Sequence, residues 1–218
     1  PRRLVTGRFV RRYKRFFVDC VLDSGESVTA HVANTGRMTG CAEPGAPCRL
    51  LSNSNPRRKL AWSLEQVQME GLWISVHTGR PNRLVEEAVA AGQLEAFEGW
   101  SVLRREPRLE EGRADLLLAR GEEQMVVEVK SATLLRRTTA GAGLVFPDSV
   151  STRGRRHMEA LGRWAESGGL AALVFVAGHE GGQWIAPADD IDPAYGQALR
   201  EAAACGVRLL GYRARMSE

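Results

Sequence analysis

The stretch RADLLLARGEEQMVVEVKS, residues 113–131, predicts a tight β-hairpin. Leu116–Leu118 lead into a short polar turn around Gly121, and the apolar run Met125–Val129 leads out of it again. Two β-rich arms that flank a polar turn containing glycine are typical of a hairpin. The sequence therefore predicts two antiparallel strands joined by a tight turn over these residues.

Three charged residues of the hairpin are candidates for chemistry. Asp115 lies on the first arm, and Glu128 and Lys130 lie on the second. Side chains two apart on a strand share a face, so Glu128 and Lys130 point the same way, opposite to the apolar residues Met125, Val127 and Val129. With the turn centred on its Gly-Glu step, Asp115 faces Glu128, with Cβ atoms roughly 4.5–5.5 Å apart. Two carboxylates this close favour a cation between them, and Mg²⁺ is typically held by one or two carboxylates.

An ordinary ion pair also explains Glu-x-Lys, and on spacing alone this is the simpler interpretation. The basic composition favours chemistry at Lys130. Of the 30 basic residues only Lys14, Lys59 and Lys130 are lysine, and the other 27 are arginine. An arginine-rich chain usually has arginine at a merely cationic site, whereas a lysine ammonium has a pKa that moves with its surroundings.

Composition places the chain among globular proteins of one large or two small domains. No apolar run approaches the roughly 20 residues that span a bilayer, and no signal-peptide pattern is present at the start. We therefore expect a cytoplasmic protein without a membrane partner. The four cysteines, at positions 20, 41, 48 and 205, form no Cys-x-x-Cys motif, which favours buried free thiols over a zinc site or disulfides.

Positive charge is concentrated at the start of the chain. Residues 1–80 carry 13 Lys/Arg against 6 Asp/Glu, a net of +7, whereas residues 81–218 carry 17 against 20, a net of −3. The first part is therefore the natural partner of a polyanion, although a solvated basic surface explains the same bias. Two groups are candidates for nucleic-acid binding: the run Arg11, Arg12, Lys14, Arg15 and the loop Arg57, Arg58, Lys59.

Aromatic residues interleave with the first basic run. Bases stack on exposed rings beside cations in single-strand binding surfaces, but the same rings can be inward residues of a strand. We expect Phe9 and Phe16 in the core, and Tyr13 is left open.

Short β-rich segments separated by turns follow, at 16–22, 27–33, 48–51, 59–69 and 72–76. Four or five such strands in about 70 residues predict a small β-barrel of the OB type over residues 1–80.

The periodicity changes from strand to helix near residue 80. The segment 82–94 has an apolar face of helical period, with Glu86 opposite that face and Glu87 at its edge. Glu87 is therefore the carboxylate that we expect to face a site, unless it is simply a solvated helix residue. Beyond it the pattern predicts three strands including the hairpin, a helix to about Ala165, a buried strand, a helix and a final strand. This order predicts a mixed α/β domain over residues 81–218, without a dinucleotide-binding glycine motif.

The helix that follows FPDSV carries Arg153 and His157 four residues apart, and therefore on one face. Beside a carboxylate site these two side chains are candidates for contact with a nucleic-acid phosphate. A basic helix surface is the alternative.

The pattern of Asp115, Glu128-Val129-Lys130 and a preceding helix acid resembles the PD-(D/E)xK nuclease superfamily, with Ala114 where that motif has proline. Over its whole length the chain further resembles the bacterial sugar fermentation stimulation protein family. The segments that carry this resemblance are RYKRFFVDC (12–20), ANTGRMTGC (33–41), NRLVEEAV (82–89), EVKSATL (128–134) and FPDSVSTRGRRHMEAL (146–161). The family implies an OB-like domain, a PD-(D/E)xK-like domain and DNA binding.

Roles for single residues follow from the resemblance. It implies Glu87, Asp115 and Glu128 as ligands of Mg²⁺ or Mn²⁺, and Lys130 as the residue that orients or activates water. It also implies importance for Asn34, Gly36 and Met38, and for the Arg153 and His157 segment, without assigning their roles.

Two functions follow from these observations. The first is a metal-dependent nuclease that acts on DNA, and the alternative is a non-catalytic, largely sequence-independent DNA-binding regulator of sugar metabolism. Strandedness, DNA against RNA, sequence preference and oligomeric state, including a homodimer, stay open.

Overall fold

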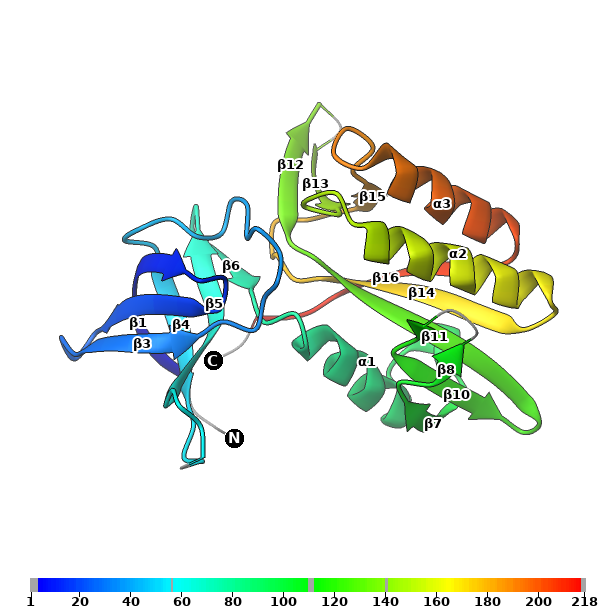
Figure 1. The fold of residues 1–218 in the computed structure, drawn as a ribbon, viewed down its shortest axis with the longest axis horizontal. Helices are drawn as coiled ribbons and strands as arrows, with labels where there is room; N and C mark the ends of the chain where they lie inside the picture. Colours follow the sequence, from blue (N-terminus) through cyan, green and yellow to red (C-terminus); the bar gives the residue numbers. More distant parts are fainter. Residues whose placement is uncertain (1–3, 56, 110–111, 140, 217–218) are drawn as a thin grey trace.

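The computed structural model describes residues 4–55, 57–109, 112–139 and 141–216, which form two domains lying side by side (Figure 1). The first domain is a β-barrel, and the second is an α/β domain with helices on both faces of a sheet. This architecture confirms the predicted fold class. Among the described residues, no helix is both long and apolar enough to cross a membrane.

The barrel is a closed ring of five strands. Their neighbours run β3-β2-β1-β4-β5, and a parallel pairing of β3 with β5 closes the ring. The sixth strand, β6, extends the sheet from β5. The strands are β1 Leu4–Tyr13, β2 Phe17–Leu22, β3 Ser27–His31, β4 Pro47–Ser52, β5 Trp62–Met69 and β6 Leu72–Ser75.

Alternating burial along these strands explains the barrel. In β2 and β3 every second residue is buried, which is the pattern of a sheet with one face against a core. Phe9 is 1% exposed in that core, as predicted. The prediction for Phe16 is wrong: it is 37% exposed and stacks on His31, because it lies in the turn before β2 rather than on an inward position. Tyr13 is half-buried and stacks on Phe17.

The second domain is built on a five-stranded sheet of order β16-β14-β11-β10-β7. The hairpin strands β10 and β11 are antiparallel, whereas β11, β14 and β16 are parallel. The strands of this sheet are β7 Ser101–Arg105, β10 Leu116–Arg120, β11 Glu123–Ala132, β14 Leu170–Ala177 and β16 Arg208–Arg213.

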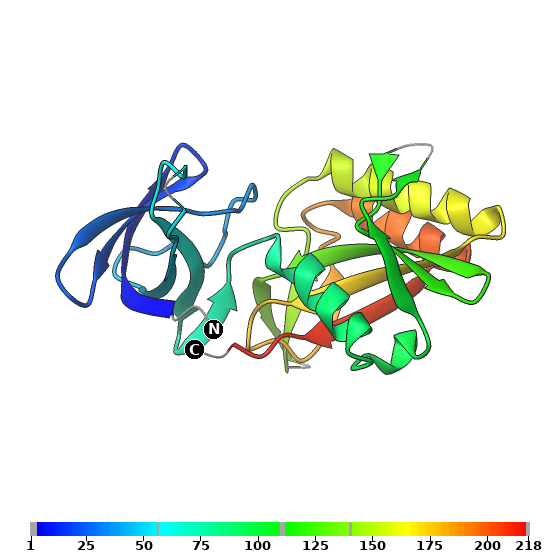
Figure 2. The same ribbon diagram turned by 90° about the horizontal axis from the view of Figure 1, so that it is seen from below.

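Helices cover both faces of this sheet (Figure 2). α1 (Arg80–Ala90) packs on one face through Val85 and Val89. α2 (Thr152–Glu166) and α3 (Pro193–Ala204) pack on the other face through residues that include Met158 and Leu199. The hairpin strand β11 therefore runs through the middle of a three-layer domain, with its Glu128 face toward α2.

Several short elements were not predicted from the sequence. β12 (Leu134–Thr138) and β13 (Gly141–Phe146) form a hairpin, and β15 (Ile185–Pro187) pairs with β13 in parallel. The remaining elements are a 3-10 turn at Glu95–Phe97 and the two-residue strands β8 (Arg108–Leu109) and β9 (Gly112–Arg113). These elements have two to six residues, and their sequences show no sustained alternation of apolar and polar positions.

The two domains are joined by backbone hydrogen bonds as well as by the chain. Ser75 N donates to Gly178 O at 2.7 Å, and Ile74 bridges to His179. Trp73 N donates to the Glu180 carboxylate at 2.7 Å. The edge of the barrel sheet is therefore held by the loop that follows β14.

Candidate metal centre and nucleic-acid surface

The hairpin has the register that the sequence predicts. Leu116 pairs with Val127, and the same register places Asp115, directly before β10, opposite Glu128. Asp115 N donates to Val127 O at 3.1 Å, which holds this end of the pair together. Val127 and Val129 pack in the core under α1, so Glu128 and Lys130 lie on the α2 face, as the alternation predicts.

Glu128 is the centre of the site. Its side chain is 3% exposed, and its Oε1 accepts hydrogen bonds from Lys130 Nζ and from His157 Nδ1, the second at 2.5 Å. Burial acts to raise the pKa of Glu128, but the hydrogen bonds and charges of His157 and Lys130 outweigh it and lower the pKa. Glu128 is therefore held as a carboxylate inside the domain.

Asp115 is the second carboxylate, and it lies between two donors. Its Oδ1 accepts from Asn82 Nδ2 at 2.6 Å, and its Oδ2 accepts from Val129 N at 2.7 Å. Burial and then the negative charge of Glu128 raise the pKa of Asp115. The effect of Glu128 on the pKa of Asp115 agrees with the register, which places the two carboxylates opposite one another.

Asn82 is a site residue that was not predicted from the sequence. Its contact with Asp115 makes it the residue of α1 that reaches the site. The available signal was its place in the first turn of the helix, where a polar side chain can extend beyond the end of the adjacent sheet.

Glu87 is not brought together with Asp115 and Glu128. It is 56% exposed and pairs with Arg83 on its own helix at 2.6 Å. Glu86, expected to face away, is 19% exposed and pairs with Arg105 of β7 at 2.6 Å. Glu87 does not face the site because α1 packs on the sheet through Val85 and Val89. Glu87 lies on the opposite side of the helix and is therefore directed to solvent.

Arg153 and His157 do share a face of α2. Arg153 Nε donates to His157 Nε2 at 3.4 Å, and the other ring nitrogen of His157 meets Glu128. The Arg153 side chain is exposed, whereas the His157 side chain is 16% exposed. The structure thus joins His157 to the carboxylate site and leaves Arg153 at the surface.

The predicted basic surface lies at one end of the barrel. The turn between β1 and β2 presents Lys14 and Arg15 to solvent, and both have positive φ, 47° and 64°. A hollow of about 700 Å³ lies beside this turn and reaches Ser149, just before α2. Of the other residues of the run, Arg11 is exposed and pairs with Asp19 at 2.8 Å.

Arg12 has a different role from its neighbours. Its guanidinium donates to Asn34 O at 2.7 Å and to Gly36 O at 2.9 Å. The Asn34 side chain holds the same loop by bonding Val76 O and Gly36 N. Gly36 approaches Asp148 so closely that a Cβ there would lie 3.0 Å from the Asp148 carboxylate. Arg12, Asn34 and Gly36 therefore shape the loop that meets the second domain.

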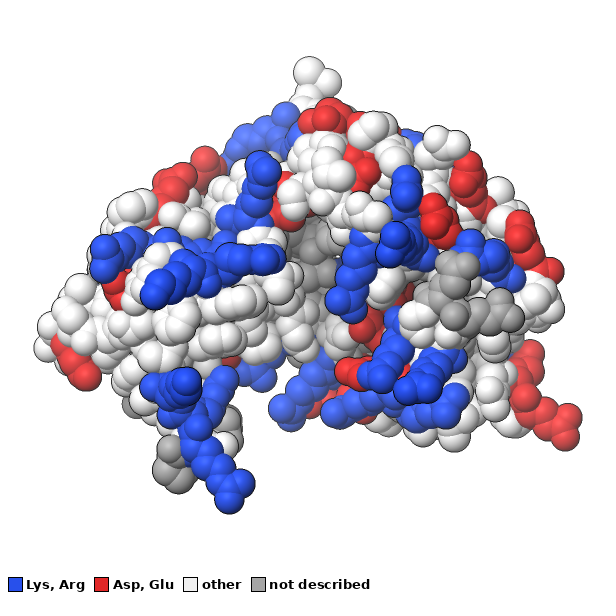
Figure 3. Space-filling model, viewed as in Figure 1, with Lys and Arg blue, Asp and Glu red and all other residues white. Residues whose placement is uncertain are grey.

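Lysine and arginine side chains gather on both domains (Figure 3). They lie on the barrel and, across the hollow between the domains, on the face of the second domain. The loop residues Arg57, Arg58 and Lys59 are all exposed. This loop is separate from the basic run at positions 11–15. The face in this view thus carries lysine and arginine side chains on both sides of the hollow.

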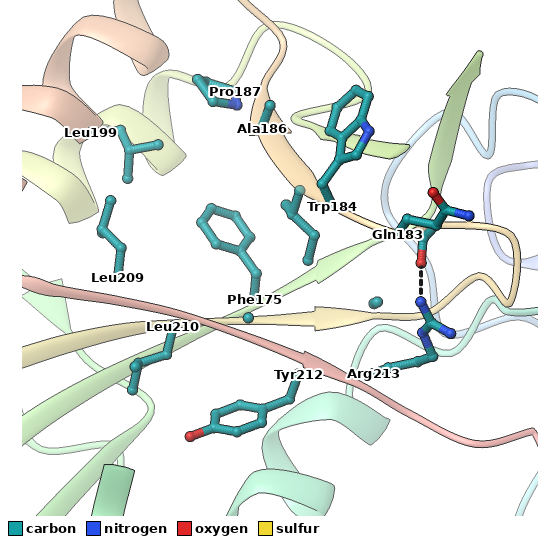
Figure 4. Close-up of a pocket in the computed structure, with 14 residues that line it drawn as sticks. Phe175, Gln183, Trp184, Ala186, Pro187, Leu199, Leu209, Leu210, Tyr212 and Arg213 are labelled. Carbon is teal, nitrogen blue, oxygen red and sulfur yellow. Dashed lines mark hydrogen bonds between the residues drawn. The ribbon is translucent and has the colours of Figure 1, made fainter. Parts of the chain in front are cut away.

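An apolar groove of about 340 Å³ lies elsewhere, between β14 and β16 on one side and β15 and α3 on the other (Figure 4). Phe175, Trp184 and Leu209 line it, and Arg213 closes one end by donating to Gly182 O at 2.6 Å. None of the predicted site residues lines this groove.

The fit of a divalent cation can be judged from the carboxylates. Among the described residues, no cluster of three or more His, Cys, Asp or Glu side chains has the arrangement of a metal cage. Asp115 and Glu128 still fit Mg²⁺ or Mn²⁺, because such ions are commonly held by one or two carboxylates with water and phosphate oxygens. Burial and then the negative charge of Glu128 raise the pKa of Asp115, and a cation between the carboxylates would relieve the repulsion.

The fold defines an OB domain joined to a three-layer α/β domain with two facing carboxylates, and comparison with known proteins gives the family. The model for the SfsA N-terminal OB domain matches residues 10–76, and that for the sugar fermentation stimulation protein RE domain matches residues 79–218. The chain belongs to the sugar fermentation stimulation protein family.

Relatives match along nearly the whole chain. A sugar fermentation stimulation protein homolog of Acidithiobacillus ferrooxidans is 46% identical over 98% of this chain and 92% of its own. One from Geotalea uraniireducens is 44% identical over 100% and 93%. Among solved structures, Pyrococcus furiosus SfsA in complex with Ca²⁺ is 27% identical, with a TM-score of 0.89 over 99% of this chain and 91% of that one.

Proposed function

We propose that the chain binds DNA and hydrolyses phosphodiester bonds with the help of a divalent cation held by Asp115 and Glu128. The observation that carries the proposal is the pair of facing carboxylates with Lys130 on the same strand face as Glu128. The relative from Pyrococcus furiosus was solved with Ca²⁺, which supports a divalent ion in this fold.

The residues have separate roles in this mechanism. Asp115 and Glu128 would hold Mg²⁺ or Mn²⁺, which supplies charge neutralisation at the phosphate and a water of lowered pKa. Lys130 keeps an ammonium beside Glu128, where it can donate to the attacking water or to a phosphate oxygen. Asn82 and the Val129 N–H orient Asp115 from opposite sides.

The basic residues would position the nucleic acid without reading its sequence. Lys14, Arg15 and Arg11 on the barrel, the loop residues 57–59 and Arg153 on α2 lie at exposed positions. Basic side chains at such positions contact phosphates, and the resulting affinity depends strongly on salt concentration. Because cations flank both sides of the hollow in Figure 3, we place the nucleic acid across it.

Cleavage and binding assays test the proposal. Single-stranded DNA, double-stranded DNA and RNA are each incubated with Mg²⁺, Mn²⁺ or EDTA, with the wild-type chain and with Lys130→Met and Glu128→Gln. We expect cleavage only with metal and only by the wild type. Glu123→Gln is the matched control, because Glu123 lies on the same strand as Glu128 but is exposed and pairs with Arg120. Binding without cleavage of any substrate would contradict the nuclease.

A second candidate function is DNA binding without catalysis, linked to the regulation of sugar metabolism. It is favoured by the engagement of Glu128 with both Lys130 and His157, an arrangement that also serves as a buried ionic network. This function predicts salt-sensitive affinity that is equal in EDTA and Mg²⁺ and that falls when Lys14 and Arg15 are neutralised. A metal requirement for binding would count against it.

A further inference from the structure

His157 lies where the carboxylate site meets α2, and its hydrogen bonds define its tautomer. Arg153 Nε–H can only donate, so His157 Nε2 accepts it and the ring proton resides on Nδ1. Nδ1–H then donates to Glu128 Oε1 at 2.5 Å. The same oxygen accepts from Lys130, so two donors from different elements converge on one atom of the buried carboxylate.

The position of His157 is fixed by the packing of its helix. Met158, next to it, is fully buried against the sheet, and Leu161 is 1% exposed one turn further on. The helix start is held by Ser151, whose Oγ accepts from Gly154 N at 2.9 Å and whose own N–H donates to Asp192 at 2.8 Å. Because α2 is capped and packed in this way, the backbone of His157 is held at a fixed place beside Glu128.

The hydrogen bonds of His157 argue against its direct contact with nucleic acid. Both of its ring nitrogens have partners, Glu128 and Arg153, and its side chain is 16% exposed. A group that contacts a phosphate backbone needs an open donor, and the outward nitrogen of His157 already receives the Arg153 guanidinium. Arg153 is the exposed member of this pair.

We propose that His157 is a positioning residue, which orients Glu128 through Nδ1 so that the carboxylate is preformed for the cation. This inference rests on the proposed function, because it assumes that Glu128 is a metal ligand. It replaces the phosphate contact predicted for His157 from the sequence. Hydrogen-bond partners that orient a ligating carboxylate typically change metal affinity 10–100-fold when removed.

Metal binding without nucleic acid tests this role. Calorimetric titration with Mn²⁺ and with Ca²⁺ compares the wild type with His157→Phe, His157→Asn and His157→Gln. Asparagine carries its amide nitrogen near the place of Nδ1, and glutamine carries it near the place of Nε2. We expect His157→Phe and His157→Gln to bind metal about 10–100-fold more weakly. His157→Asn should recover most of the affinity. Glu159→Gln, a half-buried position two residues further along α2 that pairs with Arg155, should match the wild type.

Two further measurements separate positioning from other roles. DNA affinity in EDTA should be unchanged in His157→Phe, and a nucleic-acid contact would instead weaken it. Pulsed EPR of bound Mn²⁺ should show no directly coordinated ¹⁴N, and such a coupling would make His157 a ligand and overturn the inference. Circular dichroism and thermal unfolding confirm that each variant is folded.

The outcomes distinguish the two proposals. If the wild type binds metal and His157→Phe binds it within twofold, the positioning role is overturned and the proposed function stands. If the wild type binds neither Mn²⁺ nor Ca²⁺, the metal-dependent function fails and the inference fails with it. Equal affinities for the asparagine and glutamine variants would also overturn it, because the argument depends on Nδ1.

Discussion

Replacing the two facing carboxylates by amides should change stability in opposite directions. In Glu128→Gln the half-buried ammonium of Lys130 loses its charged partner, and His157 loses a charged acceptor. In Asp115→Asn the repulsion from Glu128 disappears, while the amide oxygen can still accept one of the two hydrogen bonds. The first change removes attraction and the second removes repulsion.

The magnitude of the Glu128 effect follows from its burial. Removing one partner of a buried ion pair costs about 3–5 kcal/mol, and we take about 3 kcal/mol because Lys130 retains some access to water. At about 2–4 °C per kcal/mol for a chain of this size, Tm falls by about 6–12 °C. For Asp115→Asn we expect a rise in stability.

The pH dependence of folding stability also predicts that Glu128 stabilises the fold and that ionised Asp115 destabilises it. The pKa of Glu128 is lowered by folding, so its contribution is present above the unfolded value of about 4.3 and is lost as pH falls. The pKa of Asp115 is raised by folding, so its ionisation costs stability as pH rises above the unfolded value of about 3.9. The two variants should therefore differ most near neutral pH and converge in acid.

Urea unfolding in EDTA at pH 7 and at about pH 3.5, below the unfolded pKa values of both carboxyl groups, measures both variants against the wild type by circular dichroism. EDTA is needed because a bound cation would stabilise the wild type alone. If Asp115→Asn is destabilised as much as Glu128→Gln, the carboxylates do not repel one another and the reasoning is refuted.

Three other predictions concern the barrel. Lys14→Ala with Arg15→Ala should reduce the slope of log K against log salt for double-stranded DNA by about 1.8, measured by fluorescence anisotropy, because two phosphate contacts are lost. Arg200→Ala, an exposed arginine on α3 paired with Asp189, should leave the slope unchanged. Asn34→Ala should cost about 1–3 kcal/mol in thermal unfolding, because it leaves buried backbone groups without partners. Burial raises the pKa of Cys41 to about 12, so iodoacetamide at pH 8 should label Cys41 only after unfolding in urea, and labelling of the folded protein would contradict this.

Local patterns explain why so much of the fold could be predicted. The hairpin at 113–131 carries its own turn and alternation, and these set the register that places Asp115 opposite Glu128. The barrel strands and the three helices have clear periods of two and 3.6 residues. The small sheet of β12, β13 and β15 was missed because its strands are short and because the pairing of β13 with β15 joins segments about 40 residues apart.

The site was predicted only where neighbours in the sequence decide it. Glu128 and Lys130 share a strand face wherever that strand packs. Glu87 was misplaced because the rotation of α1 depends on how Val85 and Val89 meet the sheet, which a single helix pattern does not define. Asn82 was missed for the same reason, since its contact with Asp115 needs the helix start to lie at the end of the sheet.

The sequence by itself determined the two-domain class, the hairpin register and the strand face that carries Glu128 and Lys130, because these depend on backbone geometry over a few residues. Tertiary structure alone decided which partners reach that face. His157 contacts Glu128 across 29 positions of sequence, and Asn82 reaches Asp115 across 33. Such contacts arise from the packing of α1 and α2 on opposite faces of one sheet, and this packing is set by the whole core.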